Sequence, residues 1–384
     1  MLNKLCQNGR RLVFYCCPYV IYLLFRVCYN VSMSDTNQKI QCLEKIYAAL
    51  PGLLLPWYRE NARTLPWRVD RAPYHVWLSE IMLQQTRVET VKGYYRRFLA
   101  ALPDIKALAD APGERLLKLW EGLGYYSRAR NLQKAAREIM ERHGGVFPRD
   151  FNAILALPGI GPYTAGAIAS ICFDAPVPAL DGNVLRVIAR LTNEPDCVDT
   201  PAVKKRISAA LSGVYPAGAC GDFTQSLMEL GATVCPPNGA PNCTACPLSA
   251  LCLGKARGTA ARLPVRSGKR ARRIEPRTVF SLRCGDRIAL RKRADTGLLA
   301  GFWELPNVQG TLTETEAARR AGQWGVAPLA LLRSVEKTHI FTHVEWHMTC
   351  YYLTCRVEAP CFRWADAALL DASLPLPTAF RIFL

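Results

Sequence analysis

The sequence predicts a mainly α-helical domain followed by a smaller α+β domain. The prediction rests on a change in the spacing of apolar residues along the chain. Residues 40–253 show apolar side chains at helical spacing, with Pro and Gly at short intervals. Beyond residue 277 the segments become β-rich or alternating, with one helical stretch among them. Strands are expected at residues 278–283, 287–293, 348–354 and 362–364, and the helix at residues 314–322. A chain of 384 residues has room for both domains.

A basic stretch separates the helical region from the β-rich region. Residues 255–277 carry nine Lys or Arg and one acid, Glu275, and show neither helical nor strand periodicity. This composition is typical of a solvated linker. We therefore expect one domain over residues 33–254, a linker over residues 255–277 and a second domain over residues 278–384.

The charge of the chain is strongly positive, with 49 basic and 31 acidic residues and a formal charge of +18. Such an excess predicts an anionic partner, either nucleic acid or a membrane surface. Residues 1–32 contribute four positive charges and an apolar run at residues 12–25, which is too short to span a bilayer comfortably. No small-residue cleavage site follows the run. We interpret residues 1–32 as a doubtful extension before a start at Met33, with a membrane or export segment as the alternative.

Glu80 lies in an otherwise apolar helical segment, where Val76, Glu80 and Leu83 share one face. A carboxyl group desolvated there has a raised pKa and stays protonated near neutrality, as a general acid requires. The alternative is a glutamate at the edge of the apolar face, with its carboxylate in water.

The residues after this helix predict a corner. Thr86-Arg-Val-Glu89 has the spacing of a capping box, so a helix is expected to end at Gln84 and Gln85 and a new one to start at Thr86. Two amides would then stand at the corner, able to bond base edges or fill a gap in a base stack. An ordinary polar turn is the alternative.

A helix-hairpin-helix motif is expected around residue 160. A short helix at residues 151–157 precedes Pro-Gly-Ile-Gly-Pro, in which Gly159 and Gly161 permit a tight hairpin and Pro162 suits the first position of the next helix. The N–H groups exposed at that helix start would bind phosphate without reading sequence. A purely structural hairpin is the alternative.

Asp181 is expected to open another helix, most simply as its N-cap. A carboxylate held there could also offer its charge to a developing cation, and the residues alone do not decide between the two roles.

Four of the sixteen cysteines are grouped within 18 residues; they are Cys235, Cys243, Cys246 and Cys252. Four thiolates so placed suit a [4Fe–4S] cluster or a structural zinc ion. Zinc ribbons usually show two Cys-x-x-Cys pairs well apart, and only one pair is present here. We therefore prefer the cluster, which implies a reducing compartment.

Several segments, in the same order along the chain, resemble the MutY-type adenine DNA glycosylases of the endonuclease III superfamily. They are residues 78–88, 121–131, 157–164, 180–187 and the four-cysteine loop, and the resemblance extends over residues 45–384. It implies a helix-hairpin-helix glycosylase domain with an iron–sulfur loop at residues 235–252, followed by a Nudix-like domain. The first cysteine gap has seven residues where the family usually has six, which implies a bulge of one residue.

The resemblance also implies an activity: base excision repair of adenine mispaired with 8-oxoguanine or guanine in double-stranded DNA, leaving an abasic site. It implies a monomeric, bacterial-type enzyme of the cytoplasm that is associated with the nucleoid and has no membrane partner. By this resemblance Glu80 protonates the adenine, Asp181 stabilises the sugar cation, and Tyr163 and Asn183 assist. Two carboxyl groups with separate roles are also what glycosidic cleavage requires.

Other residues are assigned by the same resemblance to contacts with DNA. Trp67, Arg68 and Leu83 match the adenine pocket, and Gln85 and Thr86 match the corner near the mispair. Tyr125 matches an aromatic wedge that intercalates beside the oxidised guanine. Gly159 and Gly161 belong to the hairpin that binds the backbone.

Tyr163 separates two reaction types. Bifunctional relatives carry at this position a lysine whose amine forms a Schiff base with the sugar. Tyrosine cannot form one, so we expect a monofunctional glycosylase rather than a lyase. A catalytically silent lesion-binding protein is the alternative from another class, and it requires Glu80 to be unproductive.

The C-terminal region resembles the Nudix-like domain of the family. Reading the Nudix box from Gly310 places Glu316 in register, but Trp324-Gly-Val stands where the Arg-Glu-x-x-Glu-Glu block should begin. Without those carboxylates we expect no magnesium site, and hence recognition rather than hydrolysis. The segment Phe341-Thr342-His343 resembles the Phe-Ser-His loop that reads 8-oxoguanine, and Thr342 keeps the hydroxyl group.

Overall fold

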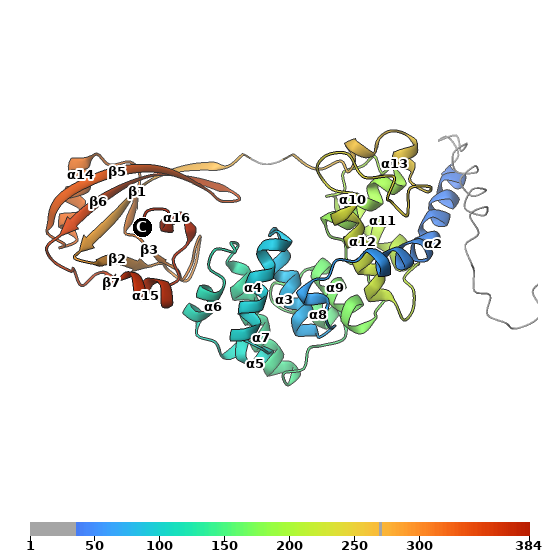
Figure 1. Ribbon diagram of the computed structural model, residues 1–384, viewed down its shortest axis with the longest axis horizontal. Helices are drawn as coiled ribbons and strands as arrows, with labels where there is room; N and C mark the ends of the chain where they lie inside the picture. The colour runs from blue at the N-terminus through green and yellow to red at the C-terminus, as the bar shows by residue number, and fades with distance from the viewer. Residues whose placement is uncertain (1–35, 269–270) are drawn as a thin grey trace, which may run out of the picture. The chain divides into compact units, whose positions relative to one another are not determined.

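The computed structural model describes residues 36–268 and 271–384 (Figure 1). The features predicted for residues 1–32, including the apolar run, and the choice of Met33 as the start lie outside this range. The described chain forms two units: residues 36–64 with Gly161–Ser267, and Leu65–Ile160 with Gly268–Leu384. Each unit is therefore built from two separate stretches of sequence.

The first unit is helical. Its elements are α2 (Thr36–Asn61), α9 (Pro162–Phe173), α10 (Gly182–Thr192), α11 (Pro201–Ser212), α12 (Cys220–Thr233), α13 (Leu253–Ala256) and a short 3-10 helix, η2 (Ala260–Arg262). In α2, buried residues recur every four positions at Ile46, Leu50 and Leu54, which is the spacing of one helical face. The helix forms because this face is covered by tertiary partners, although Pro51 and Pro56 interrupt its hydrogen-bond ladder.

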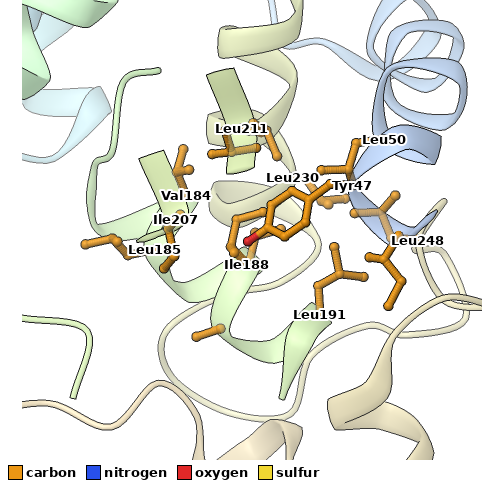
Figure 2. Packing of buried hydrophobic residues seen from close by; sticks show 14 of the residues in the cluster. Tyr47, Leu50, Val184, Leu185, Ile188, Leu191, Ile207, Leu211, Leu230 and Leu248 are labelled. Atoms are coloured by element: carbon orange, nitrogen blue, oxygen red, sulfur yellow. The ribbon is translucent and has the colours of Figure 1, made fainter. Parts of the chain in front are cut away.

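The core of the first unit joins α2 to helices that follow it by more than a hundred residues. Figure 2 shows Tyr47 and Leu50 of α2 gathered with Ile188 of α10 and Leu230 of α12. Leu248, from the four-cysteine loop, belongs to the same cluster. The loop is therefore anchored to the helical core by an apolar side chain.

The second unit begins with a helical part. It contains the 3-10 helix η1 (Pro66–Arg68) and the α-helices α3 (Pro73–Leu83), α4 (Val88–Ala101), α5 (Ile105–Asp110), α6 (Gly113–Leu119), α7 (Ser127–His143) and α8 (Phe151–Ala156). The short α8 lies where the sequence predicts it, and Asp150 caps it by accepting a hydrogen bond from the Ala153 N–H at 2.9 Å.

The rest of the second unit is a seven-stranded sheet with flanking helices (Figure 1). Its elements are β1 (Arg273–Cys284), β2 (Arg287–Lys292), β3 (Trp303–Glu304), β4 (Asn307–Gln309), α14 (Glu314–Gln323), β5 (Pro328–Ile340), β6 (Val344–Cys355), β7 (Arg363–Ala365), α15 (Ala367–Ala372) and α16 (Thr378–Arg381). The main strand order is β3-β2-β1-β6-β5, in which β1 and β6 run parallel. This arrangement confirms the predicted α+β class.

Both faces of the sheet are covered. Neighbouring residues of β1 enter different core clusters, with Val279 in one and Phe280 in the other, because side chains alternate along a strand. The cluster with Val279 includes Phe380 of α16, and the cluster with Phe280 includes Ala317 of α14. The β-rich sequence of this region therefore forms a sheet with an apolar core on each face.

Two parts of the predicted organisation are wrong. The segment 255–277 is not free of regular structure, since η2 lies within it and β1 already begins at Arg273. Arg273 to Arg277 pair in register with Val344 to Met348 of β6, so a partner far along the chain overrides the linker composition. The long strand β5, for which no strand was predicted, lies at the edge of the sheet, and most of its side chains are exposed.

In residues 36–268 and 271–384, no helix has the combination of length and apolarity needed to cross a bilayer.

Candidate active site

Glu80 is buried in the middle of α3. Its residue is 7% exposed, and Val76 to Met82 are all buried with it. The alternative in which the carboxylate reaches water from the edge of the helix is therefore wrong. A carboxyl group in such surroundings is desolvated, which disfavours its charged form.

The helix carrying Glu80 ends where the sequence predicts, but the predicted capping box does not form. Gln84 is the C-cap of α3 and Gln85 has φ of +58°. The next helix starts at Val88, not at Thr86, and it has no side-chain cap. The Thr86 hydroxyl instead donates to the Gln84 carbonyl at 3.4 Å and accepts from Arg128 at 3.3 Å. These two hydrogen bonds hold the hydroxyl away from the start of the helix that it was expected to cap.

The residues assigned to the adenine pocket and the wedge differ in exposure. Trp67 is buried in η1 and lies edge-on to Tyr95, with ring centroids 5.6 Å apart, while Arg68 and Leu83 are half-buried. Tyr125 is 43% exposed and has φ of +48°. An exposed aromatic side chain on a strained backbone suits a group that contacts a ligand better than one that fills a core.

The hairpin forms as predicted, with different roles for its two glycines. Gly159 has φ of +78°, and a Cβ atom there would lie 2.5 Å from Cβ of Asn131. The fold itself therefore requires glycine at this position. Gly161 is the N-cap of α9 with an extended φ of −97°, and a Cβ added there meets no atom within 4 Å. Pro162 follows in the first turn of α9, as predicted.

Asp181 is the N-cap of α10, as predicted, and its carboxylate has a second partner. One oxygen accepts from the Val184 N–H at 2.7 Å, and the other accepts from the Asn183 amide at 2.7 Å. Burial raises the pKa of the Asp181 carboxyl, and these two hydrogen bonds oppose that rise. Tyr163, half-buried in the first turn of α9, belongs to the same unit.

Arg186 connects Asn183 to the four-cysteine loop. It is 5% exposed and donates to the Asn183 amide oxygen at 2.7 Å and to the Cys235 carbonyl at 2.8 Å. The sequence motif contains Arg186, but no role was assigned to it. The available signal was a pair of arginines one turn apart, Arg186 and Arg190, in the helix that Asp181 opens.

The four cysteines of the loop are half-buried and free of disulfides. Burial raises the pKa of the Cys246 thiol to about 12, and the neighbouring thiols of Cys235, Cys252 and Cys243 add to that rise, so the four lie close enough to interact. Arg190 donates to Sγ of Cys235 at 3.1 Å. Within the described residues, no group of three or more His, Cys, Asp and Glu side chains is arranged to hold a metal ion.

The Phe341-Thr342-His343 loop joins β5 to β6. The Phe341 N–H donates to the Val344 carbonyl at 2.8 Å, and the Phe341 ring lies edge-on to Trp346 with centroids 4.8 Å apart. Thr342 and His343 are exposed at the tip. Phe341 is therefore held by its contacts with Val344 and Trp346, while Thr342 and His343 stay accessible.

The second unit brings five of the predicted site residues together around one cavity of about 930 Å³. Its lining includes Gln85, Tyr125, Phe341, Thr342 and His343, and the Thr342 hydroxyl donates to the Tyr125 hydroxyl at 3.2 Å. Arg130 and Arg272 also line the cavity and were not predicted. An opening with cations, aromatic rings and hydroxyl groups suits a nucleobase and its phosphates.

The chain matches two protein families. Residues 78–211 match the HhH-GPD superfamily base excision DNA repair proteins, and residues 278–384 match the NUDIX domain. The chain is 38% identical to an adenine DNA glycosylase of Mus musculus, with 86% of this chain and 77% of the mouse protein covered. It is 35% identical to an adenine DNA glycosylase of Homo sapiens, with 81% and 68% covered.

A solved structure supports the helical fold. A thermostable thymine-DNA glycosylase is 29% identical to this chain with a TM-score of 0.51, and 56% of this chain and 98% of that protein are covered. These likenesses confirm the resemblance that the motifs indicated. The chain belongs to the adenine DNA glycosylases within the HhH-GPD superfamily of base excision DNA repair proteins.

Proposed function

We propose that this protein removes adenine that lies opposite 8-oxoguanine or guanine in duplex DNA, hydrolysing the N-glycosidic bond and leaving an abasic site. It acts as a monomer in the cytoplasm of a bacterial-type cell, in association with the nucleoid. Family membership supports the reaction class, and the burial of Glu80 in an apolar helix is the observation that carries the mechanism.

Glu80 acts as the general acid. Adenine extruded from the duplex is a poor leaving group until its ring is protonated, and a buried carboxylic acid supplies that proton. The pocket that holds the base is formed by Trp67, Arg68 and Leu83. Protonation weakens the bond between the base and the sugar, which then cleaves.

Asp181 stabilises the sugar cation that remains. Its carboxylate lies at a helix N-terminus, next to the amide of Asn183. Water completes the hydrolysis. Tyr163 and Asn183 orient the carboxylate and the nucleoside. Because Tyr163 has no amine, no Schiff base forms and the strand stays intact.

Recognition of the mispair uses the corner, the wedge and the loop of the C-terminal domain. Gln85, Thr86 and Tyr125 enter the base stack, and Phe341, Thr342 and His343 read 8-oxoguanine. The cavity lined by most of these residues supports this assignment. The hairpin N–H groups next to Gly159 and Gly161 hold a phosphate, since an N-terminal helix end attracts anions.

The four cysteines hold a [4Fe–4S] cluster in this proposal. The donor chemistry supports this, because four thiols without disulfides fall within 18 residues of sequence and an arginine donates to one of the sulfurs. When bound, the cluster supplies a rigid cross-link for residues 235–252. Arg186 then holds Asn183 against the fixed Cys235 carbonyl.

The test is a single-turnover assay on duplexes carrying adenine opposite 8-oxoguanine, guanine or thymine. Wild type should release adenine from the first two duplexes, and Glu80→Gln should be slower by about a thousandfold, because an amide cannot supply the proton. Glu89→Gln is the matched control, since Glu89 is exposed on the neighbouring helix. Tight binding without adenine release by wild type would establish a silent lesion-binding protein instead, and an unimpaired Glu80→Gln would remove the assigned role.

A further inference from the structure

Arg128, in the first turn of α7, is a buried arginine with no carboxylate partner among the residues that the structure describes. The residue is 8% exposed, and burial lowers the pKa of its guanidinium to about 10. A buried cation is tolerated only when ordered dipoles offset its charge. The hydrogen-bond partners of Arg128 therefore indicate the structural role of its buried guanidinium.

The first set of partners lies at the end of the helix that carries Glu80. Nη1 of Arg128 donates to the carbonyls of Ile81 at 2.6 Å, Met82 at 2.9 Å and Gln84 at 2.8 Å. The last carbonyls of a helix have no partner within it and form the negative end of its dipole. Arg128 thus caps α3 one turn after Glu80.

The second set of partners lies in the loop that presents Tyr125. Nη2 donates to the carbonyls of Leu123 at 3.2 Å and Gly124 at 3.0 Å, and Nε approaches the Tyr125 carbonyl at 3.4 Å. A single planar guanidinium therefore ties the end of α3 to this loop.

Two strained residues lie at these junctions. Between residues 65 and 160, Gln85 and Tyr125 are the non-glycine residues with positive φ, at +58° and +48°. Arg128 binds the carbonyl directly before each of them, on Gln84 and Gly124. A left-handed backbone persists at such residues only where the surroundings impose it, and these hydrogen bonds impose it on both.

We propose that Arg128 is a positioning residue that holds Gln85 and Tyr125 in the conformations that open the base stack, so that adenine can leave the duplex. This assignment rests on the proposed function, in which duplex adenine is the substrate. Arg128 acts on base extrusion, before the proton transfer from Glu80. Lysine cannot replace it, because one ammonium group lacks the planar fork that reaches two segments at once.

The experiment follows base extrusion and bond cleavage separately. The fluorescence of 2-aminopurine, placed opposite 8-oxoguanine where the target adenine would be, reports unstacking without chemistry. Single-turnover adenine release reports the whole reaction. Arg128→Lys should lower both the extruded fraction and the release rate at least tenfold, whereas Glu80→Gln should keep extrusion and lose release.

Arg137→Lys is the matched control, because Arg137 lies on the same helix and donates to a single carbonyl, that of Ala109, at 3.0 Å. It should behave as wild type. Equal losses in both lysine variants would mean a general loosening of α7 and overturn the proposal, as would wild-type extrusion by Arg128→Lys. If wild type extrudes the base without releasing it, the proposed function is refuted. The role of Arg128 in extrusion is then still tested by the fluorescence of the two lysine variants.

A second variant tests the backbone argument. Asparagine adopts the left-handed conformation more readily than glutamine, so Gln85→Asn should restore part of the extrusion lost by Arg128→Lys. No restoration would count against the proposal. If Arg128→Lys does not fold, hydrogen exchange on wild type decides. The amides of Thr86 and Arg128, which close the turns at 3.2 and 2.9 Å, should then exchange as slowly as those of α3, and exchange at the rate of an exposed loop would refute the assignment.

Discussion

At the scale of single residues, Asp181 combines a structural and a chemical position. Its side chain caps α10, which any Asp, Asn, Ser or Thr could do, yet only a carboxylate can also stabilise a cation. The hydrogen bond from Asn183 favours the ionised form, while burial favours the protonated form. Protonation in the wild type therefore begins at a higher pH than for an ordinary aspartate.

This balance predicts the pH dependence of Asn183→Ala. Because the reaction uses ionised Asp181, its rate should fall as the pH drops through the pKa of that carboxyl. Loss of the Asn183 hydrogen bond raises this pKa further, so the acidic limb of the rate profile should move to higher pH. A hydrogen bond to a charged group contributes about 1.5 kcal/mol, which corresponds to a rate loss of about tenfold on the acidic limb.

Single-turnover rates from pH 5 to pH 9 measure the effect. Asn61→Ala is the matched control, since the Asn61 amide donates only to the Trp57 carbonyl on an exposed helix end. An unchanged acidic limb in Asn183→Ala would show that the amide does not govern the ionisation of Asp181.

Two threonines show what could and could not be predicted at this scale. Thr313 and Glu316 form the capping box of α14, whereas Thr86 and Glu89 have the same spacing and do not. At Thr86 a distant guanidinium binds the hydroxyl, and local sequence contains no sign of it. Residue patterns predict a cap well only where no tertiary donor competes.

At the scale of elements, the hairpin and α9 separate two uses of glycine. Gly166 lies in the middle of α9, where a Cβ atom would come within 2.4 Å of the Pro178 carbonyl oxygen. Gly161 precedes the helix in open space. One glycine is required by packing, and the other leaves room for a ligand.

Gly166→Ala should therefore lower the free energy of unfolding by about 2 kcal/mol through overpacking. Gly161→Ala should change it by less than about 1 kcal/mol and weaken DNA binding about tenfold, because the added methyl group stands in front of N–H groups that face a phosphate. Thermal or denaturant unfolding and titration of labelled duplex measure the two effects. Full DNA affinity in Gly161→Ala would argue for the purely structural hairpin.

The elements were predicted unevenly for a physical reason. The segments at α8, α9 and α10 carry local signals, such as Asp150, Pro162 and Asp181 at helix starts, and these helices form there. The strand β5 is mostly exposed, and the first residues of β1 carry mostly polar or charged side chains. Both are strands because β6 lies between them. At the start of β1, pairing across more than sixty residues leaves no periodic pattern in the local sequence.

At the scale of the whole molecule, the four-cysteine loop links chemistry to stability. Leu248 of the loop belongs to the core of the first unit, and Cys235 accepts a hydrogen bond from Arg186. Loss of the proposed cluster should therefore disturb both the core and the position of Asn183.

We expect purified wild type to contain about four iron atoms per chain and Cys246→Ser to contain fewer. Cys246→Ser should also unfold at a lower temperature and release adenine more slowly. Cys197→Ser is the matched control, a free and half-buried cysteine of the same unit outside the loop, and it should keep its iron. Zinc without iron in the wild type would refute the cluster.

The division of the first unit between two stretches of sequence sets an order of events during synthesis. Helix α2 is made early, but its apolar face is covered by α10 and α12, which leave the ribosome only after the whole helical part of the second unit. Until then the apolar face of α2, formed by Ile46, Leu50 and Leu54, has no native partners. A nascent chain stopped before residue 230 therefore exposes an apolar, aggregation-prone helix. The unit that carries Asp181 and the four cysteines can therefore close around its core only after the helical part of the second unit has been made.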